Sequence, residues 1–154
     1  MIPSVGSQRA GRRLATAHAV ELLHAFFQAR PEVRLAWLFG SRGRGDGSDW
    51  SDVDVAVWCG GRVPEVPWGY PALVAAELMD LLGTGAVDVA LFETASPLLA
   101  HRIVTEGVVL CCRDEAEQVR CRARALLRYL DTQPLRDLEA RYLALRQSTK
   151  ETSR

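Results

Sequence analysis

Residues 40–57 read Gly40-Ser41-Arg42-Gly43-Arg44-Gly45-Asp46-Gly47-Ser48-Asp49-Trp50-Ser51-Asp52-Val53-Asp54-Val55-Ala56-Val57. The apolar run Leu35-Ala36-Trp37-Leu38-Phe39 comes directly before them and predicts a buried strand, and a second strand is predicted to begin near Asp52. The intervening segment is rich in Gly and small polar residues, which is the composition of a turn. We therefore expect a hairpin that holds a phosphate-binding loop.

Two carboxylates in the second strand are expected to share one face. Asp52 and Asp54 are two residues apart, and side chains alternate between the faces of a strand, so both project from the same side. Valines at the odd-numbered positions cover the other side. Two acids on one face indicate a cation site, and the alternative is a strand with a solvated face. The same face continues through Ala56 and Trp58, which favours the floor of a cleft.

A third acid has a similar setting. Asp88 lies in the otherwise apolar run Val87-Asp88-Val89-Ala90-Leu91-Phe92. A carboxylate in such a strand is costly unless it is paired, bound to a metal or exposed at the strand's end. If this strand lies beside the one that carries Asp52 and Asp54, three carboxylates converge. Hard oxygen ligands of this kind suit Mg²⁺, which binds proteins through a few carboxylates together with substrate phosphates.

This pattern resembles the nucleotidyltransferase superfamily that has the fold of the polymerase β palm. The resemblance rests on Gly40-Ser41, a gap of ten residues, the pair Asp52 and Asp54, and the later strand acid Asp88. It extends over roughly residues 35–130 and is most similar to the minimal nucleotidyltransferases, particularly the MntA-type antitoxins that act with HEPN-domain ribonuclease toxins. An ordinary Gly-rich hairpin turn is the alternative for the loop alone.

The resemblance implies a role for each residue of the motif. Gly40 and Ser41 would contact the phosphates of a nucleotide, and Arg42 and Arg44 are expected either to reach its β or γ phosphate or to point to solvent. These four residues form the expected nucleotide-binding set. The catalytic and metal-binding set is Asp52, Asp54 and Asp88. In this family the pair of acids holds Mg²⁺, and the third holds a second ion or acts as a general base.

The expected function is Mg²⁺-dependent transfer of AMP from ATP to a hydroxyl group of a partner protein. The resemblance implies ATP as the donor, a tyrosine as the acceptor and a HEPN ribonuclease toxin as the partner, so the chain would be an antitoxin. One alternative is a nucleotidyltransferase acting on an aminoglycoside or a similar small molecule, although the chain has little room for a helical substrate domain. Another is a non-catalytic antitoxin that blocks the toxin sterically.

Length and charge set further limits. The 154 residues suit one nucleotidyltransferase domain at 1–132, with an amphipathic helix and tail at 133–154 as a possible partner-binding extension. The formal net charge is zero, which argues against a protein that binds nucleic acid directly through its overall charge. From Arg120 onward the chain contains nine of the 19 basic residues and four of the 19 acidic ones, so its C-terminal part is basic.

Cysteine usage and hydropathy predict the compartment. The four cysteines form no CxxC pair and have no zinc-type spacing, which favours structural thiols in a reducing compartment. No apolar stretch approaches the roughly 20 residues that cross a bilayer, and the first residues lack an apolar signal core. We therefore expect a cytoplasmic protein with no membrane association.

The predicted fold is α+β, with a mixed β-sheet flanked by helices as in the polymerase β palm. Helical spacing of apolar residues predicts helices over 8–29, 72–82, 97–106 and 114–130, and a strand over 108–112 follows the third of them. A further helix is expected beyond Pro134, where it either folds back on the domain or docks on another protein. The final eight residues are expected to be disordered.

Overall fold

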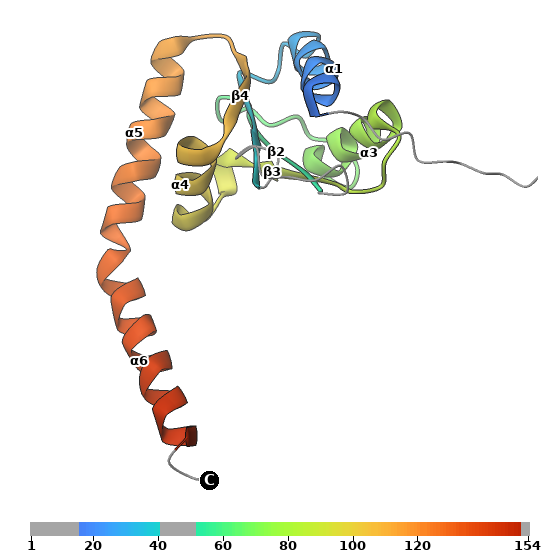
Figure 1. Cartoon of the computed structure of the whole chain (residues 1–154). Coiled ribbons are helices and arrows are strands. Elements are labelled where there is room, and N and C mark those ends of the chain that lie inside the picture. The colour runs from blue at the N-terminus through green and yellow to red at the C-terminus, as the bar shows by residue number, and fades with distance from the viewer. Residues whose placement is uncertain (1–15, 41–51, 152–154) are drawn as a thin grey trace, which may run out of the picture.

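The residues that the structure describes form a four-stranded sheet with helices on both faces (Figure 1). The computed structural model describes residues 16–40 and 52–151. The strands are β1 (Leu35–Phe39), β2 (Val53–Trp58), β3 (Val87–Leu91) and β4 (Val108–Cys112). Their order across the sheet is β3-β2-β1-β4. Strand β1 is antiparallel to both of its neighbours, whereas β2 and β3 are parallel, so the predicted mixed sheet is confirmed.

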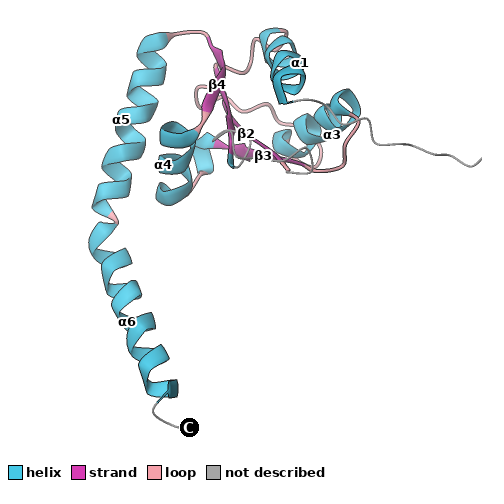
Figure 2. Ribbon diagram, viewed as in Figure 1, coloured by secondary structure: helices cyan, strands magenta, loops and turns pink. Residues whose placement is uncertain are grey.

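The helices cover the two faces of this sheet in pairs (Figure 2). On one face lie α1 (Thr16–Gln28) and α3 (Tyr70–Leu82), and on the other lie α4 (Pro97–Glu106) and α5 (Glu115–Asp131). Each face has its own apolar cluster of buried side chains. This two-sided burial explains why the strands read as nearly continuous apolar runs rather than as alternating ones.

Alternation along β2 determines which face the acidic residues share. Val53, Val55 and Val57 are buried in the cluster beneath α1 and α3. Ala56 and Trp58 belong to the cluster on the other side. Because side chains alternate along a strand, Asp54 projects from the face that α4 and α5 cover.

The predicted helices agree with the structure over most of their lengths. Helix α3 begins at Tyr70, two residues before the predicted start, because Pro71 is well suited to a first helical turn. It ends at Gly83, which adopts the left-handed conformation (φ 65°) that favours glycine. The first helix is described from Thr16, so its predicted first half lies outside the described residues.

The C-terminal helix is longer than predicted. Helix α6 (Gln133–Glu151) continues through residues 147–151, which the sequence led us to expect as disordered. The prediction was wrong there because Gln147, Lys150 and Glu151 are good helix formers, and they continue a helix that is already formed. After Thr132, α6 extends away from the sheet and its covering helices (Figure 1). Its large apolar side chains Leu135, Leu138, Tyr142 and Leu145 are exposed.

The structure also bears on the sequence predictions about cysteines and membrane-spanning segments. The four cysteines are free thiols, three of them buried, as expected for structural residues. Among the described helices, none is both long enough and apolar enough to span a bilayer.

Candidate active site

The structure places Asp54 and Asp88 side by side on adjacent strands. They are register partners in the parallel β2–β3 ladder. Partners in register on neighbouring strands project from the same face, so both carboxylates lie on the α4 and α5 side of the sheet. Asp54 is half-buried, whereas Asp88 and Asp52 are exposed. The sheet therefore brings together the two strand acids that lie more than thirty residues apart in the sequence.

Gly40 lies directly against the Asp54 carboxylate. It follows β1, whose last residue, Phe39, pairs with Asp54. Its φ of +70° is in the left-handed region, and a Cβ added at this position would lie 2.2 Å from Asp54 Oδ2. Only glycine fits here without displacing the carboxylate. The other predicted nucleotide-binding residues, Ser41, Arg42 and Arg44, lie outside the described residues.

The acidic side chains act on one another electrostatically. Burial is the main reason that the pKa of Asp54 is raised above its ordinary value, and the negative charges of Asp88 and Asp52 raise it further. The guanidinium of Arg102 opposes this shift. Asp54 therefore lies in a concentration of negative charge that the described part of the chain balances only partly.

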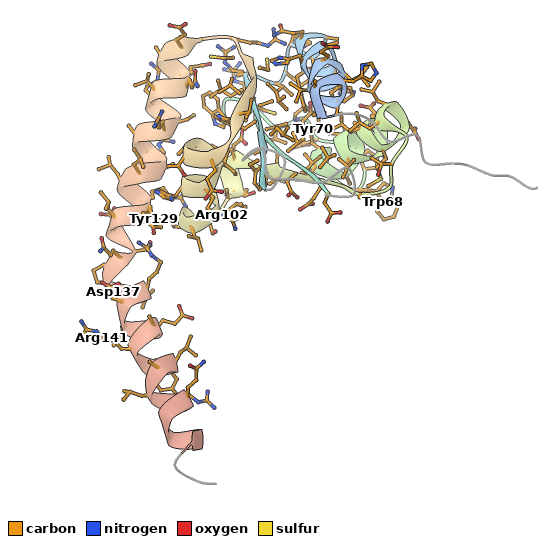
Figure 3. The ribbon with its side chains drawn as sticks, in the orientation of Figure 1. Trp68, Tyr70, Arg102, Tyr129, Asp137 and Arg141 are labelled. Atoms are coloured by element: carbon orange, nitrogen blue, oxygen red, sulfur yellow. The ribbon has the colours of Figure 1, made fainter. Side chains whose placement is uncertain are left out.

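Arg102 is a feature of the site that sequence reasoning missed. It extends from α4, the helix that covers this face of the sheet (Figure 3). No motif contains it, because its nearness to Asp54 arises only when α4 packs on this face of the sheet. In the sequence it is one more exposed arginine of an amphipathic helix.

The donor chemistry of the site suits a divalent cation of the Mg²⁺ type. Its side chains offer carboxylate oxygens, which are the ligands that Mg²⁺ prefers, and a cation there would relieve the repulsion among the acids. Within residues 16–40 and 52–151, however, no group of three His, Cys, Asp or Glu side chains is arranged to hold a metal ion. The metal-binding set Asp52, Asp54 and Asp88 thus stays a prediction.

A protein-family model matches the part of the chain that contains the candidate active site. The family model for "Polymerase beta, Nucleotidyltransferase" matches residues 21–116, which is more than half of the chain. The match includes Gly40, Asp54 and Asp88. No curated protein sequence matches the chain.

Solved structures share its fold. A toxin–antitoxin crystal structure with AMP-PNP is 23% identical, with a TM-score of 0.68, and the alignment covers 85% of this chain and 99% of that chain. The toxin–antitoxin MntA–HepT is 21% identical, with a TM-score of 0.62 and coverage of 84% and 96%. A complex from Shewanella oneidensis, tri-AMPylated HEPN toxin with MNT antitoxin, is 21% identical, with a TM-score of 0.64 and coverage of 81% and 98%. At these identities the likeness establishes the fold.

Proposed function

The chain belongs to the polymerase β nucleotidyltransferase family, and from this membership we propose that it transfers AMP from ATP to a hydroxyl group of a partner HEPN-type toxin. The observation that carries the proposal is the register pairing of Asp54 with Asp88 beside Gly40. The family motif combines these residues in one site. A fold that kept them apart could not support the reaction.

Two comparisons support the choice of donor and partner. One structure of the same fold contains AMP-PNP, an analogue of ATP. Another is a complex between an MNT antitoxin and a HEPN toxin that carries AMP groups. Both structures are of other proteins. They are the reason that we propose ATP as the donor and a toxin as the acceptor for this chain. A tyrosine acceptor and dependence on Mg²⁺ are further parts of the proposal.

In the proposed reaction, the acceptor hydroxyl attacks the α-phosphorus of ATP. A new bond forms between that oxygen and phosphorus, the bond from the α-phosphorus to the bridging oxygen breaks, and pyrophosphate leaves. Gly40 allows the backbone to approach the phosphates, and Ser41, Arg42 and Arg44 would donate to their oxygens. The acceptor's proton would pass to Asp88 if that residue is the general base.

Asp52 and Asp54, with Asp88 as the third candidate ligand, would hold Mg²⁺. When bound, the ion would offset the negative charge of the triphosphate. The half-buried position of Asp54 fixes one of these oxygens next to the Gly40 backbone. Arg102 would act as a positioning residue, because its charge favours the ionised form of Asp54 that binding requires.

The proposal is tested with the purified chain, Mg²⁺ and the product of the neighbouring open reading frame. We expect ATP labelled at the α-phosphate to label the partner, and ATP labelled at the γ-phosphate to leave it unlabelled. Changing the acceptor tyrosine to phenylalanine, once it is mapped, should abolish labelling, and so should EDTA.

Two results would count against this proposal. Labelling from the γ-phosphate would indicate phosphoryl transfer instead. Absence of α-label, in a preparation that binds ATP and the partner, would contradict AMP transfer to that protein. The second result would also leave steric occlusion as the explanation for any neutralisation of the toxin.

The contact between Gly40 and Asp54 gives a separate prediction. In Gly40→Ala, the added methyl group must displace the Asp54 carboxylate, which is 2.2 Å from the position of the Cβ. Since a misplacement of about 1 Å costs on the order of 10²-fold in rate, we expect AMP transfer to fall by roughly 10- to 100-fold. The backbone strain of a non-glycine residue at this φ costs about 1–2 kcal/mol of stability.

Gly83→Ala provides a matched control for this substitution. Gly83 has a similar φ of +65°, but its Cβ would meet no atom within 4 Å. Both variants should therefore lose similar stability in thermal unfolding, and only Gly40→Ala should lose activity beyond what unfolding explains. Equal activity of the two variants would mean that the position of Asp54 does not matter for the reaction.

A further inference from the structure

A cavity with both apolar and charged lining residues lies at the end of the sheet opposite the candidate active site. Its volume is about 280 Å³. The candidate active site lies near the start of β2, at Asp54, whereas this cavity begins where β2 ends, at Trp58 and Gly60. The 3-10 helix η1 (Phe92–Thr94) and helix α5 supply its other walls. We call it the Arg–Glu pocket, after Arg120, Arg124, Arg128 and Glu93, which line it.

The arginines of the pocket form one row on α5. Arg120, Arg124 and Arg128 are spaced four residues apart, so their side chains lie along the same face of the helix. Arg128 donates to the Ala95 carbonyl. In the described part of the chain, no carboxylate forms an ion pair with Arg120 or Arg124. Like charges at this spacing repel each other, and an anion between them would remove that repulsion.

Glu93 contributes an unpaired carboxylate oxygen to the same cavity. Its Oε1 accepts hydrogen bonds from the backbone N–H groups of Cys59 (2.6 Å) and Gly61 (3.4 Å). These bonds hold the side chain in place. Its Oε2 is buried and has no hydrogen-bond partner among the described residues. Buried acceptors are nearly always satisfied, so this oxygen is suited to a donor that the chain itself does not supply.

Positively and negatively charged side chains both act on the thiol of Cys121, which also lines the pocket. Burial raises the pKa of Cys121 to about 11, and the negative charges of Glu117 and Glu93 also raise it. The positive charges of Arg124 and Arg120 act in the opposite direction. The positive row and the single acid are thus neighbours in the pocket, although they form no ion pair with each other.

We propose that the Arg–Glu pocket binds a nucleoside monophosphate, with the phosphate on Arg120 and Arg124 and an N–H donor of the base on Glu93 Oε2. Arginine is well suited to phosphate because its planar guanidinium forms paired, charge-assisted hydrogen bonds. Trp58, also in the wall, offers a half-buried aromatic side chain to the base. The cavity volume is slightly below the usual range for ligand sites, roughly 300–1,000 Å³, which favours a mononucleotide over a larger ligand.

The test is calorimetric titration of the full chain with AMP in EDTA. We expect saturable binding that persists in Asp54→Asn, whose candidate active site is altered. The double variant R120Q/R124Q should bind AMP at least about tenfold more weakly, because two charged donors to the phosphate are lost. Arg141→Gln is the matched control, since Arg141 lies on α6, remote from the sheet (Figure 3), and AMP binding should be unchanged.

Glu93→Gln separates the nucleotide from a simple anion. It should weaken binding of AMP, whose base loses its acceptor, without weakening binding of inorganic phosphate. Unaltered AMP affinity in R120Q/R124Q, or no saturable binding by the wild type, would overturn the proposal. Inorganic phosphate binding as tightly as AMP would overturn the nucleotide assignment in favour of a plain anion site. AMP transfer should continue in R120Q/R124Q, so failure of this pocket and failure of the proposed reaction are distinguishable.

Discussion

Replacing Asp54 by asparagine is expected to reduce AMP transfer by about 10³-fold. Removing one neutral hydrogen-bond donor from an active site typically costs about 10²–10³-fold, and a charged group that holds a cation contributes at least as much. Asp54 lies at the centre of the candidate site. Gly40 and Asp88 are its neighbours, and the positive charge of Arg102 acts on its carboxylate. Initial rates of α-label transfer to the partner would measure the loss.

The same substitution should leave stability unchanged or increase it. The pKa of Asp54 is raised in the folded chain, which means that folding disfavours its ionised form at neutral pH. Asparagine removes that penalty and keeps the size of the side chain. We therefore expect Asp54→Asn to unfold at the same temperature as the wild type or at a higher one. An active site that is costly for stability is a common trade-off.

Asp80→Asn is the matched control, because Asp80 is an exposed acid on α3. It should keep full activity. If Asp54→Asn transfers AMP at the wild-type rate, the candidate active site is wrong. If Asp54→Asn transfers no AMP and still protects cells from the toxin, neutralisation proceeds by steric occlusion. AMP transfer by the wild type would then serve another purpose.

Local sequence was sufficient to predict much of the fold because its strands are buried on both faces. A run such as that of β2 is apolar at nearly every position, so an aspartate within it is conspicuous. The meeting of Asp54 with Asp88 also followed from the sequence, once the two strands were expected to be neighbours. Their exact pairing came only from the structure.

The residues that sequence reasoning missed act through contacts between distant segments. Arg102 has no motif, and Glu93 looks like a surface acid beside a turn. The row from Arg120 to Arg128 reads as the solvated side of a helix. Arg102 and the arginine row acquire their environments when α4 and α5 pack on the sheet, whereas Glu93 acquires its own through hydrogen bonds from Cys59 and Gly61. The periodicity of one helix carries no information about what lies beneath it. Single-sequence patterns therefore drew attention to Asp52, Asp54 and Asp88, and they left Arg102, Glu93 and the arginine row of α5 unassigned.

Arg113→Ala is expected to lower the free energy of unfolding by about 2–3 kcal/mol, because hydrogen bonds of a charged group contribute roughly 1.5–3 kcal/mol. Its Nε donates to the Val33 carbonyl at 2.7 Å. Its Nη2 lies within hydrogen-bond distance of the carbonyls of Phe27 (3.1 Å), Gln28 (3.2 Å) and Arg30 (2.8 Å). These groups are at the C-terminal end of α1, where carbonyls lack helical partners and favour a cation.

Arg113→Lys tests whether geometry or charge provides this stability. Lysine keeps the positive charge, but its compact ammonium group cannot reach carbonyls on both α1 and the following loop as a guanidinium does. We expect it to recover less than half of the loss, as measured by urea unfolding. Arg62→Ala, the control, removes an exposed arginine from a loop and should change little. Full recovery by lysine would mean that charge alone joins α1 to the end of β4. In that case the hydrogen bonds of Arg113 would contribute nothing specific to anchoring the helix that covers the valine face of β2.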